Sequence, residues 1–203
     1  MARATRTLRT LLTRNDPRGF ADALREPDAR DALAGETFSA LAVSHYDFSG
    51  MDLSNTEWND CVLDHILFND ANLEGAYFTG STLIDCTLGG TRLSGVSMDG
   101  AGLRGCTVRG CSMEGSELTG TGFDNCTLED IDLQDATWTS VTISGGSVTN
   151  LRGTGGSLSA LTLRDVQTAE VELDGMELSR CVASGESVPA GFEKLSGRRK
   201  RIL

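Results

Sequence analysis

The sequence is poor in proline, histidine and aromatic side chains. Its 203 residues include 3 prolines, 2 histidines and only 5% aromatic residues. A length of this order fits one sizeable domain. No apolar run approaches the ~18 residues that a membrane-spanning helix requires. The first fifteen residues are rich in arginine but lack an uninterrupted apolar stretch, so they do not predict a secretory signal peptide, although a transit peptide stays compatible with their composition.

Basic residues are fewer than acidic ones. The chain has 18 Lys and Arg and 29 Asp and Glu, which gives a net charge of −11. Binding to a phosphate backbone requires clustered Lys and Arg, so we predict no direct nucleic-acid binding. An acidic chain favours a protein partner with a basic surface. The charge is unevenly distributed. Residues 36–185 hold 6 basic and 22 acidic residues, whereas residues 1–35 and 186–203 carry net charges of +2 and +3.

A repeat of five residues runs through most of the chain. Every fifth residue from Phe48 to Leu178 is apolar at all but two of 27 positions, the exceptions being Gly153 and Thr168. We call these the large inward positions. The residue two places earlier is mostly small and never charged, and we call it the small inward position. Polar and charged residues occupy the other three places, and Gly, Asp or Asn is usual at the last of them.

A period of five fits neither a helix nor a simple strand. Two inward positions two residues apart are typical of one face of a short strand. The Gly, Asp or Asn that follows is typical of a tight turn. Each unit is therefore predicted to form one side of a coil, with a strand-like piece and a corner.

This pattern resembles the pentapeptide-repeat family, and residues 71–75 (AlaAsnLeuGluGly) and 91–95 (ThrArgLeuSerGly) match its consensus closely. The resemblance covers roughly residues 41–183 without an insertion. It implies an all-β fold, a right-handed quadrilateral β-helix of about seven coils with four units in each coil. Residues twenty apart would then lie above one another, at the strand spacing of about 4.8 Å.

Gly153 leaves a gap in the row of large inward positions. Leu151 and Leu161 occupy small inward positions nearby, and they suggest local repacking in which one position supplies the volume missing from another. A functional kink in the rod is the alternative interpretation.

The ends of the repeat need covers, because an open stack of coils exposes unpaired strand edges. We divide the chain into a helical N-terminal cap or arm at 1–35, the β-helix at 36–185 and a basic, solvated C-terminal tail at 186–203. Asp16 and Pro17 predict a helix start, and Pro27 predicts a second short helix that ends at Gly35. The alternative for residues 1–35 is a docking arm for a partner, suggested by four basic residues: Arg3, Arg6, Arg9 and Arg14.

All six cysteines fall at small inward positions, namely Cys61, Cys86, Cys106, Cys111, Cys126 and Cys181. We expect buried free thiols rather than disulfides or catalytic groups. Buried free thiols agree with a reducing compartment, and we expect a bacterial cytoplasmic protein.

Two histidines, His45 and His65, are twenty residues apart and are followed after twenty more by Asp85. This spacing suggests a metal site. The alternative, which we prefer, is a column of solvent-exposed corners at which the repeat tolerates any polar residue. We therefore expect no metal, no cofactor and no catalytic residues, since no nucleophile–base pair is recognisable.

The resemblance implies a binding function, because gyrase-interacting members of the family, such as the mycobacterial and Qnr fluoroquinolone-resistance proteins, imitate DNA. This chain lacks their dimer helix and the loop insertions of the Qnr rods. The hypothesis is therefore an acidic rod that binds DNA gyrase or another type II topoisomerase. The alternative is a scaffolding module with an unrelated partner. Among the four faces of the predicted rod, the most acidic carries these partner-binding candidates: Asp52, Glu74, Glu114, Asp132, Asp135, Glu172 and Asp174.

Overall fold

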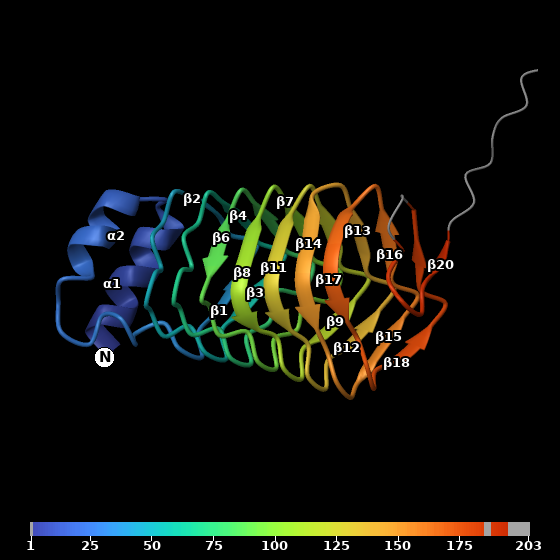
Figure 1. Cartoon of the computed structure of the whole chain (residues 1–203). Coiled ribbons are helices and arrows are strands. Elements are labelled where there is room, and N and C mark those ends of the chain that lie inside the picture. The colour runs from blue at the N-terminus through green and yellow to red at the C-terminus, as the bar shows by residue number, and fades with distance from the viewer. Residues whose placement is uncertain (1, 185–187, 195–203) are drawn as a thin grey trace, which may run out of the picture.

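The computed structural model describes residues 2–184 and 188–194, which form two helices followed by twenty short strands (Figure 1). The strands pair in parallel, and almost every pair joins residues exactly one coil apart in the chain. Leu103, for example, pairs with Phe123, which in turn pairs with Ile143. The result is a β-solenoid of about seven turns, which confirms the predicted all-β repeat.

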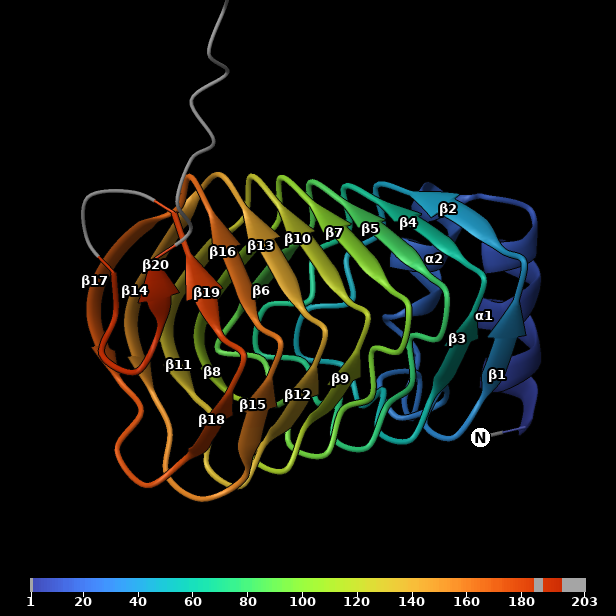
Figure 2. The same ribbon diagram turned by 90° about the vertical axis from the view of Figure 1, so that its right-hand side faces the viewer.

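The strands form four parallel sheets along the solenoid, and Figure 2 shows the longest of them along one face. That nine-stranded sheet contains β2 (Ala42–Ser44), β4 (Val62–Asp64), β5 (Thr82–Ile84), β7 (Gly102–Arg104), β10 (Gly122–Asp124), β13 (Thr142–Ser144), β16 (Thr162–Arg164), β19 (Val182–Ala183) and β20 (Glu193–Lys194). The five-stranded sheet contains β6 (Thr87–Gly89), β8 (Thr107–Ser112), β11 (Thr127–Asp132), β14 (Ser147–Arg152) and β17 (Gln167–Glu172). The other two sheets contain β1 (Thr37–Ser39) and β3 (Glu57–Asn59), and β9 (Glu117–Thr119), β12 (Thr137–Thr139), β15 (Ser157–Ser159) and β18 (Glu177–Ser179).

The corners of the coil recur every five residues as backbone in the left-handed region. Asn55, Asp60, His65 and Asp70 have φ of 54°, 53°, 52° and 57°. Glycine enters this region freely, and Asn and Asp enter it more readily than other residues. A corner every five residues and a pairing offset of twenty give four sides to each turn, as the resemblance implied.

The inward positions fill the interior of the rod with side chains. The large positions from Phe48 to Leu163 are buried without exception, and rings twenty residues apart stack along the axis. Trp58 stacks on Phe78 with a centroid distance of 6.4 Å, and Phe48 stacks on Phe68 at 5.5 Å. The five-residue register predicted from the sequence is therefore confirmed.

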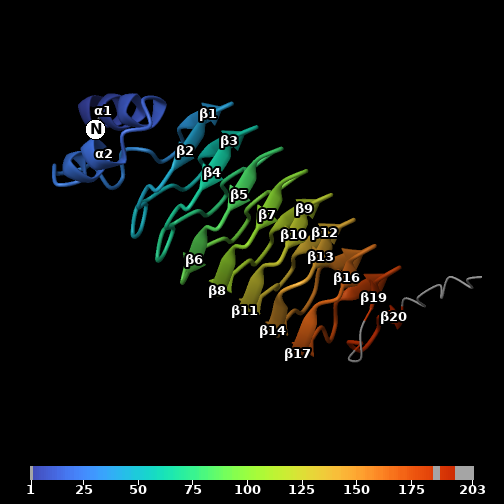
Figure 3. The same ribbon diagram turned by 90° about the horizontal axis from the view of Figure 1, so that it is seen from above.

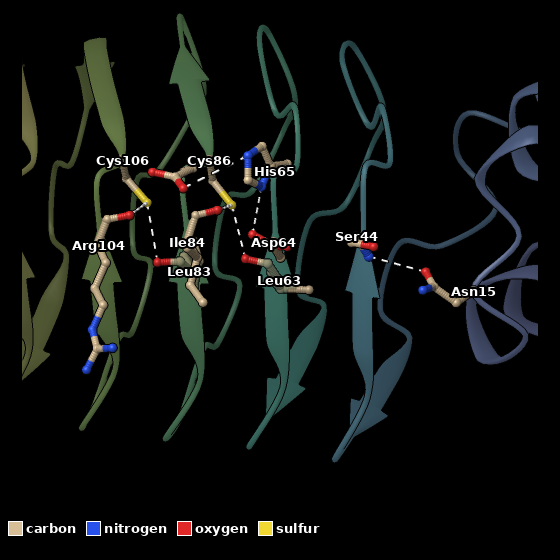
Figure 4. A network of polar contacts seen from close by, with 11 residues as sticks. Asn15, Ser44, Leu63, Asp64, His65, Leu83, Ile84, Cys86, Arg104 and Cys106 are labelled. Carbon is tan, nitrogen blue, oxygen red and sulfur yellow. Dashed lines mark hydrogen bonds and ion pairs between the residues drawn. The ribbon is translucent and has the colours of Figure 1, made fainter.

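Several small inward positions hold a side chain that donates a hydrogen bond to the backbone of the preceding coil. The thiol of Cys86 donates to the carbonyl of Leu63 at 3.3 Å, and that of Cys106 donates to the carbonyl of Leu83 at 3.5 Å (Figure 4). In both pairs the acceptor lies 23 residues earlier, and the hydroxyl of Thr91 reaches its acceptor by the same step. All six cysteines are free and buried, as predicted.

The two helices cover the first coil at the N-terminal end of the rod (Figure 3). They are α1 (Ala2–Thr13) and α2 (Pro17–Ala23), and Asp16 caps α2 by accepting a hydrogen bond from the backbone N–H of Gly19. Phe20 makes edge-to-face contacts with the rings of Tyr46 and Phe48, at centroid distances of 5.1 and 5.3 Å. The cap thus continues the apolar core of the rod.

The predicted second short helix between Pro27 and Gly35 is wrong. This segment consists of turns, in which Ala29 and Ala32 each donate a backbone hydrogen bond to the residue three places earlier. Asp28 has a φ of +64°, a conformation that a right-handed helix cannot contain. The segment instead pairs with the first coil, since the backbone N–H of Asp52 donates to the carbonyl of Arg30.

At the other end, β20 pairs with β19 and adds a strand from the segment that the sequence assigned to the basic tail. The basic run at 198–201 lies outside the described residues. Among the described helices, neither has both the length and the apolar character needed to cross a membrane.

Candidate interaction surface

The candidate residues of the acidic face lie on one side of the solenoid, where the sequence placed them. One row crosses seven consecutive coils through paired residues, in the order Asp52, Asn72, Arg92, Ser112, Asp132, Arg152 and Glu172. A second acidic group follows two residues further along each coil and includes Glu74, Glu114 and Asp174. Asp135 occupies a corner of the same face, with a φ of 55°. Six of the seven candidates are exposed and Asp52 is half-buried.

Local hydrogen bonds hold two of these carboxylates, Asp52 and Asp132, against the backbone. Oδ1 of Asp52 accepts from the backbone N–H of Ser54 at 3.0 Å and from the side-chain amide of Asn72 at 3.1 Å. Oδ1 of Asp132 accepts from the backbone N–H of Gln134 at 3.0 Å. Because charged acceptors form the stronger hydrogen bonds, these aspartates are fixed in position and their negative charges have fixed places on the rod.

Two arginines, Arg92 and Arg152, interrupt this row, as the twenty-residue spacing in the sequence indicates. Arg152 is paired with Asp132 on one side and Glu172 on the other, and its Nε lies 3.7 Å from a carboxylate oxygen of Glu172. Both partners of this ion pair are about two-thirds exposed, so the pair contributes little to stability. Its effect is to reduce the net negative charge locally, which leaves Glu114, Asp135 and Asp174 as more effective negative groups.

A second surface of opposite charge lies on the N-terminal cap. Arg3, Arg6 and Arg9 are exposed on α1, and Arg14 is exposed in the turn directly after it. Arg9 forms an ion pair with Glu36 and lies over the ring of Phe38, at 5.4 Å from its centroid. A hollow of about 680 Å³ runs along this side of the helix, between its arginines and Glu36. The basic cap and the acidic rod are therefore two distinct surfaces.

The interior offers no comparable site among the described residues, because the inward positions are occupied by packed side chains. Four of the six thiols have a raised pKa, whereas the hydrogen bond with Cys106 lowers the pKa of Cys86. Burial raises the pKa of Cys61 and of Cys111, and the hydrogen bond with Cys106, followed by burial, raises that of Cys126. A thiol with a raised pKa is a poor source of thiolate.

Comparison with known proteins places these features in a family. The family model for pentapeptide repeats matches in overlapping stretches at residues 47–83, 61–100, 76–115 and 97–135. No curated protein matches the sequence significantly.

Solved structures with a similar architecture include QnrB1, a plasmid-mediated fluoroquinolone resistance protein. In its trypsin-treated form it shares 17% identity over 73% of this chain and 85% of its own, with a TM-score of 0.44. A pentapeptide repeat protein from the Arabidopsis thaliana thylakoid lumen shares 21% identity over 57% of this chain and 74% of its own, with a TM-score of 0.31. HetL is involved in heterocyst differentiation regulation in the cyanobacterium Nostoc sp. It shares 15% sequence identity over 71% of this chain and 88% of its own, with a TM-score of 0.22. These values assign no partner to this chain.

Proposed function

This chain belongs to the pentapeptide-repeat family, and on that premise we propose that it is a non-enzymatic rod that binds another protein through its acidic surface. The partner that we propose is a protein with a basic DNA-binding groove, a type II topoisomerase and first of all DNA gyrase. The acidic face would occupy the groove in place of DNA, so that the rod protects the enzyme from inhibitors or competes with DNA.

The observation that supports this proposal is the combination of a filled rod with fixed, outward-facing carboxylates. Residues 36–185 carry 22 acidic and 6 basic residues, and the inward positions carry no charge. Every charge of the repeat therefore lies on the outside. A straight acidic rod of this kind presents a regular negative potential to a basic surface, which speeds and orients association.

The charge density limits how strongly the rod can imitate DNA. Duplex DNA carries one negative charge per about 1.7 Å of its axis. Successive coils rise by about 4.8 Å, and the seven acidic candidates are spread over seven coils together with Arg92 and Arg152. We therefore expect an interaction of moderate strength that weakens as salt is raised, because the screening length falls from about 30 Å at 0.01 M to about 10 Å at 0.1 M.

A supercoiling assay with purified gyrase tests the proposal. The intact rod is expected to alter supercoiling at low salt, and less so as the salt concentration rises. Neutralising the acidic face with Glu114→Gln, Asp132→Asn, Asp135→Asn and Asp174→Asn should weaken the effect. The matched control removes four acids from the opposite, least acidic face, with Asp64→Asn, Asp85→Asn, Asp124→Asn and Asp165→Asn.

All eight side chains point outward, so both sets of variants are expected to fold. At the corner positions Asn can adopt the same left-handed backbone conformation as the Asp that it replaces. A larger loss for the first set supports the DNA-mimic proposal. Equal losses for the two sets, or no effect of the intact rod at low salt, would contradict it.

The basic surface on α1 favours a second candidate function, that of a scaffold that holds an acidic partner at its cap. In that case Arg6→Glu together with Arg14→Glu should abolish capture of the partner, and the acidic-face variants should leave it unchanged. These two arginines are exposed and lie beside the hollow along α1. A pull-down that compares the two sets of variants distinguishes the two functions.

A further inference from the structure

The sequence favoured a corner without a metal, but from the geometry of the side chains we propose that one corner of the rod is a binding site for a divalent transition metal ion, Zn²⁺, with His65 and Asp85 as its main ligands. His45 is assigned as the third protein ligand, and Asp64 as the group that orients His65. The four residues come from three consecutive coils near the helical cap, and the acidic face described above shares none of them. The proposal is therefore independent of the partner of the rod.

The backbone places the three ligands in one column. His45, His65 and Asp85 all occupy the left-handed corner of their coils, with φ of 62°, 52° and 49°. The backbone N–H of His45 donates to the carbonyl of Asp64, and that of His65 donates to the carbonyl of Ile84, both at 2.9 Å. Because these bonds fix the spacing between coils, the three side chains emerge from a rigid edge and pay little backbone entropy on binding an ion.

The side chains already lie close together. Nδ1 of His65 is 2.7 Å from Oδ1 of Asp64, and Nε2 of His65 is 4.0 Å from Oδ2 of Asp85. One ligand atom each of Asp64, His65 and Asp85 lies within 4.8 Å of the others. His45 is not part of this set and would turn its ring to reach the ion. The imidazole rings of His45 and His65 are 4.9 Å apart between centroids. Figure 4 shows His65 between the coils, with its contact to Asp64.

The contact between His65 and Asp64 assigns a role to each ring nitrogen. An imidazole that donates Nδ1–H to a carboxylate has its lone pair on Nε2, an arrangement that recurs behind zinc-bound histidines. In this corner that lone pair is directed toward Asp85. The carboxylate of Asp64 thus holds the ring of His65 in the tautomer and orientation that a metal ion requires.

The spacing suits an ion between Nε2 of His65 and Oδ2 of Asp85. Zinc bonds to nitrogen and oxygen are about 2.0–2.2 Å long, so two ligands on one ion can be at most about 4.2 Å apart. The observed 4.0 Å falls within that limit. A tetrahedral angle brings the ligands closer, to about 3.4 Å, and both side chains are about half exposed and free to move by that amount. Imidazole together with carboxylate is a donor set that suits zinc.

The corner column supplies a matched control for this site. Asp165 stands at the same corner several coils further along, with a φ of 52° and the same charge as Asp85. Its column neighbours are Gly145, one coil earlier, and residue 185, which lies outside the described residues. Replacement by Asn is conservative at each of these corners, because Asn adopts the left-handed conformation readily and already occupies this corner at Asn125.

Isothermal titration of the full chain, made without a histidine tag, with Zn²⁺ alone tests the proposal. We expect one ion per chain, with binding weakened at least tenfold by His65→Asn and by Asp85→Asn. His45→Asn should also weaken binding, and Asp64→Asn should weaken it by about 10–100-fold as the loss of an orienting carboxylate does. Asp165→Asn should leave the affinity unchanged.

A second measurement distinguishes direct binding of zinc by the histidines from a general effect of removing a negative charge from the protein. Zinc should broaden or shift the ring signals of His45 and His65 in the NMR spectrum of the intact protein, and it should raise the melting temperature of the wild type but not of His65→Asn. The proposal fails if the intact chain takes up no zinc. It also fails if Asp165→Asn weakens binding as much as Asp85→Asn does, or if His65→Asn binds as tightly as the wild type.

Discussion

Met176 fills the space that a side chain at residue 153 would otherwise occupy. A Cβ atom added to Gly153 would overlap the sulfur of Met176 and would contact Leu133 at 3.3 Å and Leu173 at 3.4 Å. Met176 stands at a small inward position, 23 residues after Gly153, and its flexible thioether suits an irregular gap. The missing side chain is thus replaced from the next coil. This favours local repacking over a functional kink, although the filling residue is Met176 rather than Leu151 or Leu161 alone.

A double-mutant cycle at this contact should show strong coupling. Met176→Ala should cost about 2–4 kcal/mol of unfolding free energy because it leaves a cavity. Gly153→Leu should cost about 1–3 kcal/mol because it overpacks the same space. The double variant should be more stable than the sum of the two losses predicts, since Leu at 153 would fill the cavity. Denaturant titration measures the unfolding free energy of all four proteins. If the two single losses simply add in the double variant, Met176 does not fill the space at residue 153.

The register of the repeat is tested by two adjacent residues in β7. Leu103 is buried and Arg104 is exposed. Leu103→Asp should prevent folding or cost several kcal/mol, because an unpaired carboxylate would be buried. Arg104→Asp should change stability by less than about 0.5 kcal/mol. Circular dichroism and denaturant titration measure both, and similar stabilities would refute the register at this coil.

The six thiols should react with a thiol reagent only after unfolding. Each is buried, and each donates a hydrogen bond to a carbonyl 23 residues earlier, as Cys111 does to Leu88. Burial at the inward positions keeps the reagent away from all six thiols. Mass spectrometry should find no label on the native protein and six labels in denaturant. An exposed reference thiol, Thr119→Cys, should react at once, whereas fast labelling of Cys106 in the native rod would disprove its inward position.

Corners occupied by residues other than Gly, Asn or Asp carry backbone strain that substitution can release. Ala160 has a φ of +56°, a region that costs an L-residue roughly 1–2 kcal/mol. Ala160→Gly should therefore raise the unfolding free energy, by up to about 1 kcal/mol after the greater entropy of unfolded glycine is counted. Ala71→Gly, at a buried small inward position, should lower it. Thermal denaturation compares the two, and a loss in both would contradict the strain.

The cap should loosen at high pH. The hydroxyl of Tyr46 donates to the carbonyl of Leu11 at 2.9 Å, and burial, assisted by the charge of Asp16, raises the pKa of Tyr46 to about 12. Between the unfolded pKa of about 10 and about 12, the folded state holds the proton that the unfolded state has lost. The contribution of Tyr46 to stability is therefore constant below pH 10 and falls as the pH rises toward 12.

Tyr46→Phe tests this dependence, since it removes the titrating group. It should lower stability at pH 8 by about 1 kcal/mol through the lost hydrogen bond, and the difference from the wild type should shrink above pH 10. Denaturant titrations at several pH values measure this difference. A difference that stays constant from pH 8 to 11.5 would show that Tyr46 does not titrate as described.

The sequence predicted the solenoid well because its register is strictly local. Each unit repeats the same inward pair, so positions such as Leu103 and Cys106 could be assigned without knowledge of distant contacts. The cap was harder to predict. Pro27 suggested a helix start, but Asp28 adopts a left-handed conformation and the carbonyl of Arg30 pairs with the first coil. Tertiary pairing determined that segment, and no local signal reports it.

The sequence predicted where charged and polar side chains lie on the surface, but not which of them contact one another. The twenty-residue spacing placed His45 and His65 in one column and Arg152 between two acids. It could not show that Asp64, the residue before His65 in the chain, turns toward the ring and bonds to Nδ1. Nor could it show which carboxylate Arg152 approaches. Such details depend on side-chain rotamers, which the repeat leaves free on the outside of the rod.

The offset of twenty residues also makes the length of this molecule adjustable in steps. Gly122 pairs with Gly102, and Gly102 pairs with Thr82. Removing residues 102–121 would join Ala101 directly to Gly122 and set Gly122 beside Thr82, with the inward positions unchanged. One whole coil would disappear and the rod would shorten by about 4.8 Å. The length of such a fold changes in fixed steps, so gain or loss of a coil can match the length of the rod to the surface that it binds.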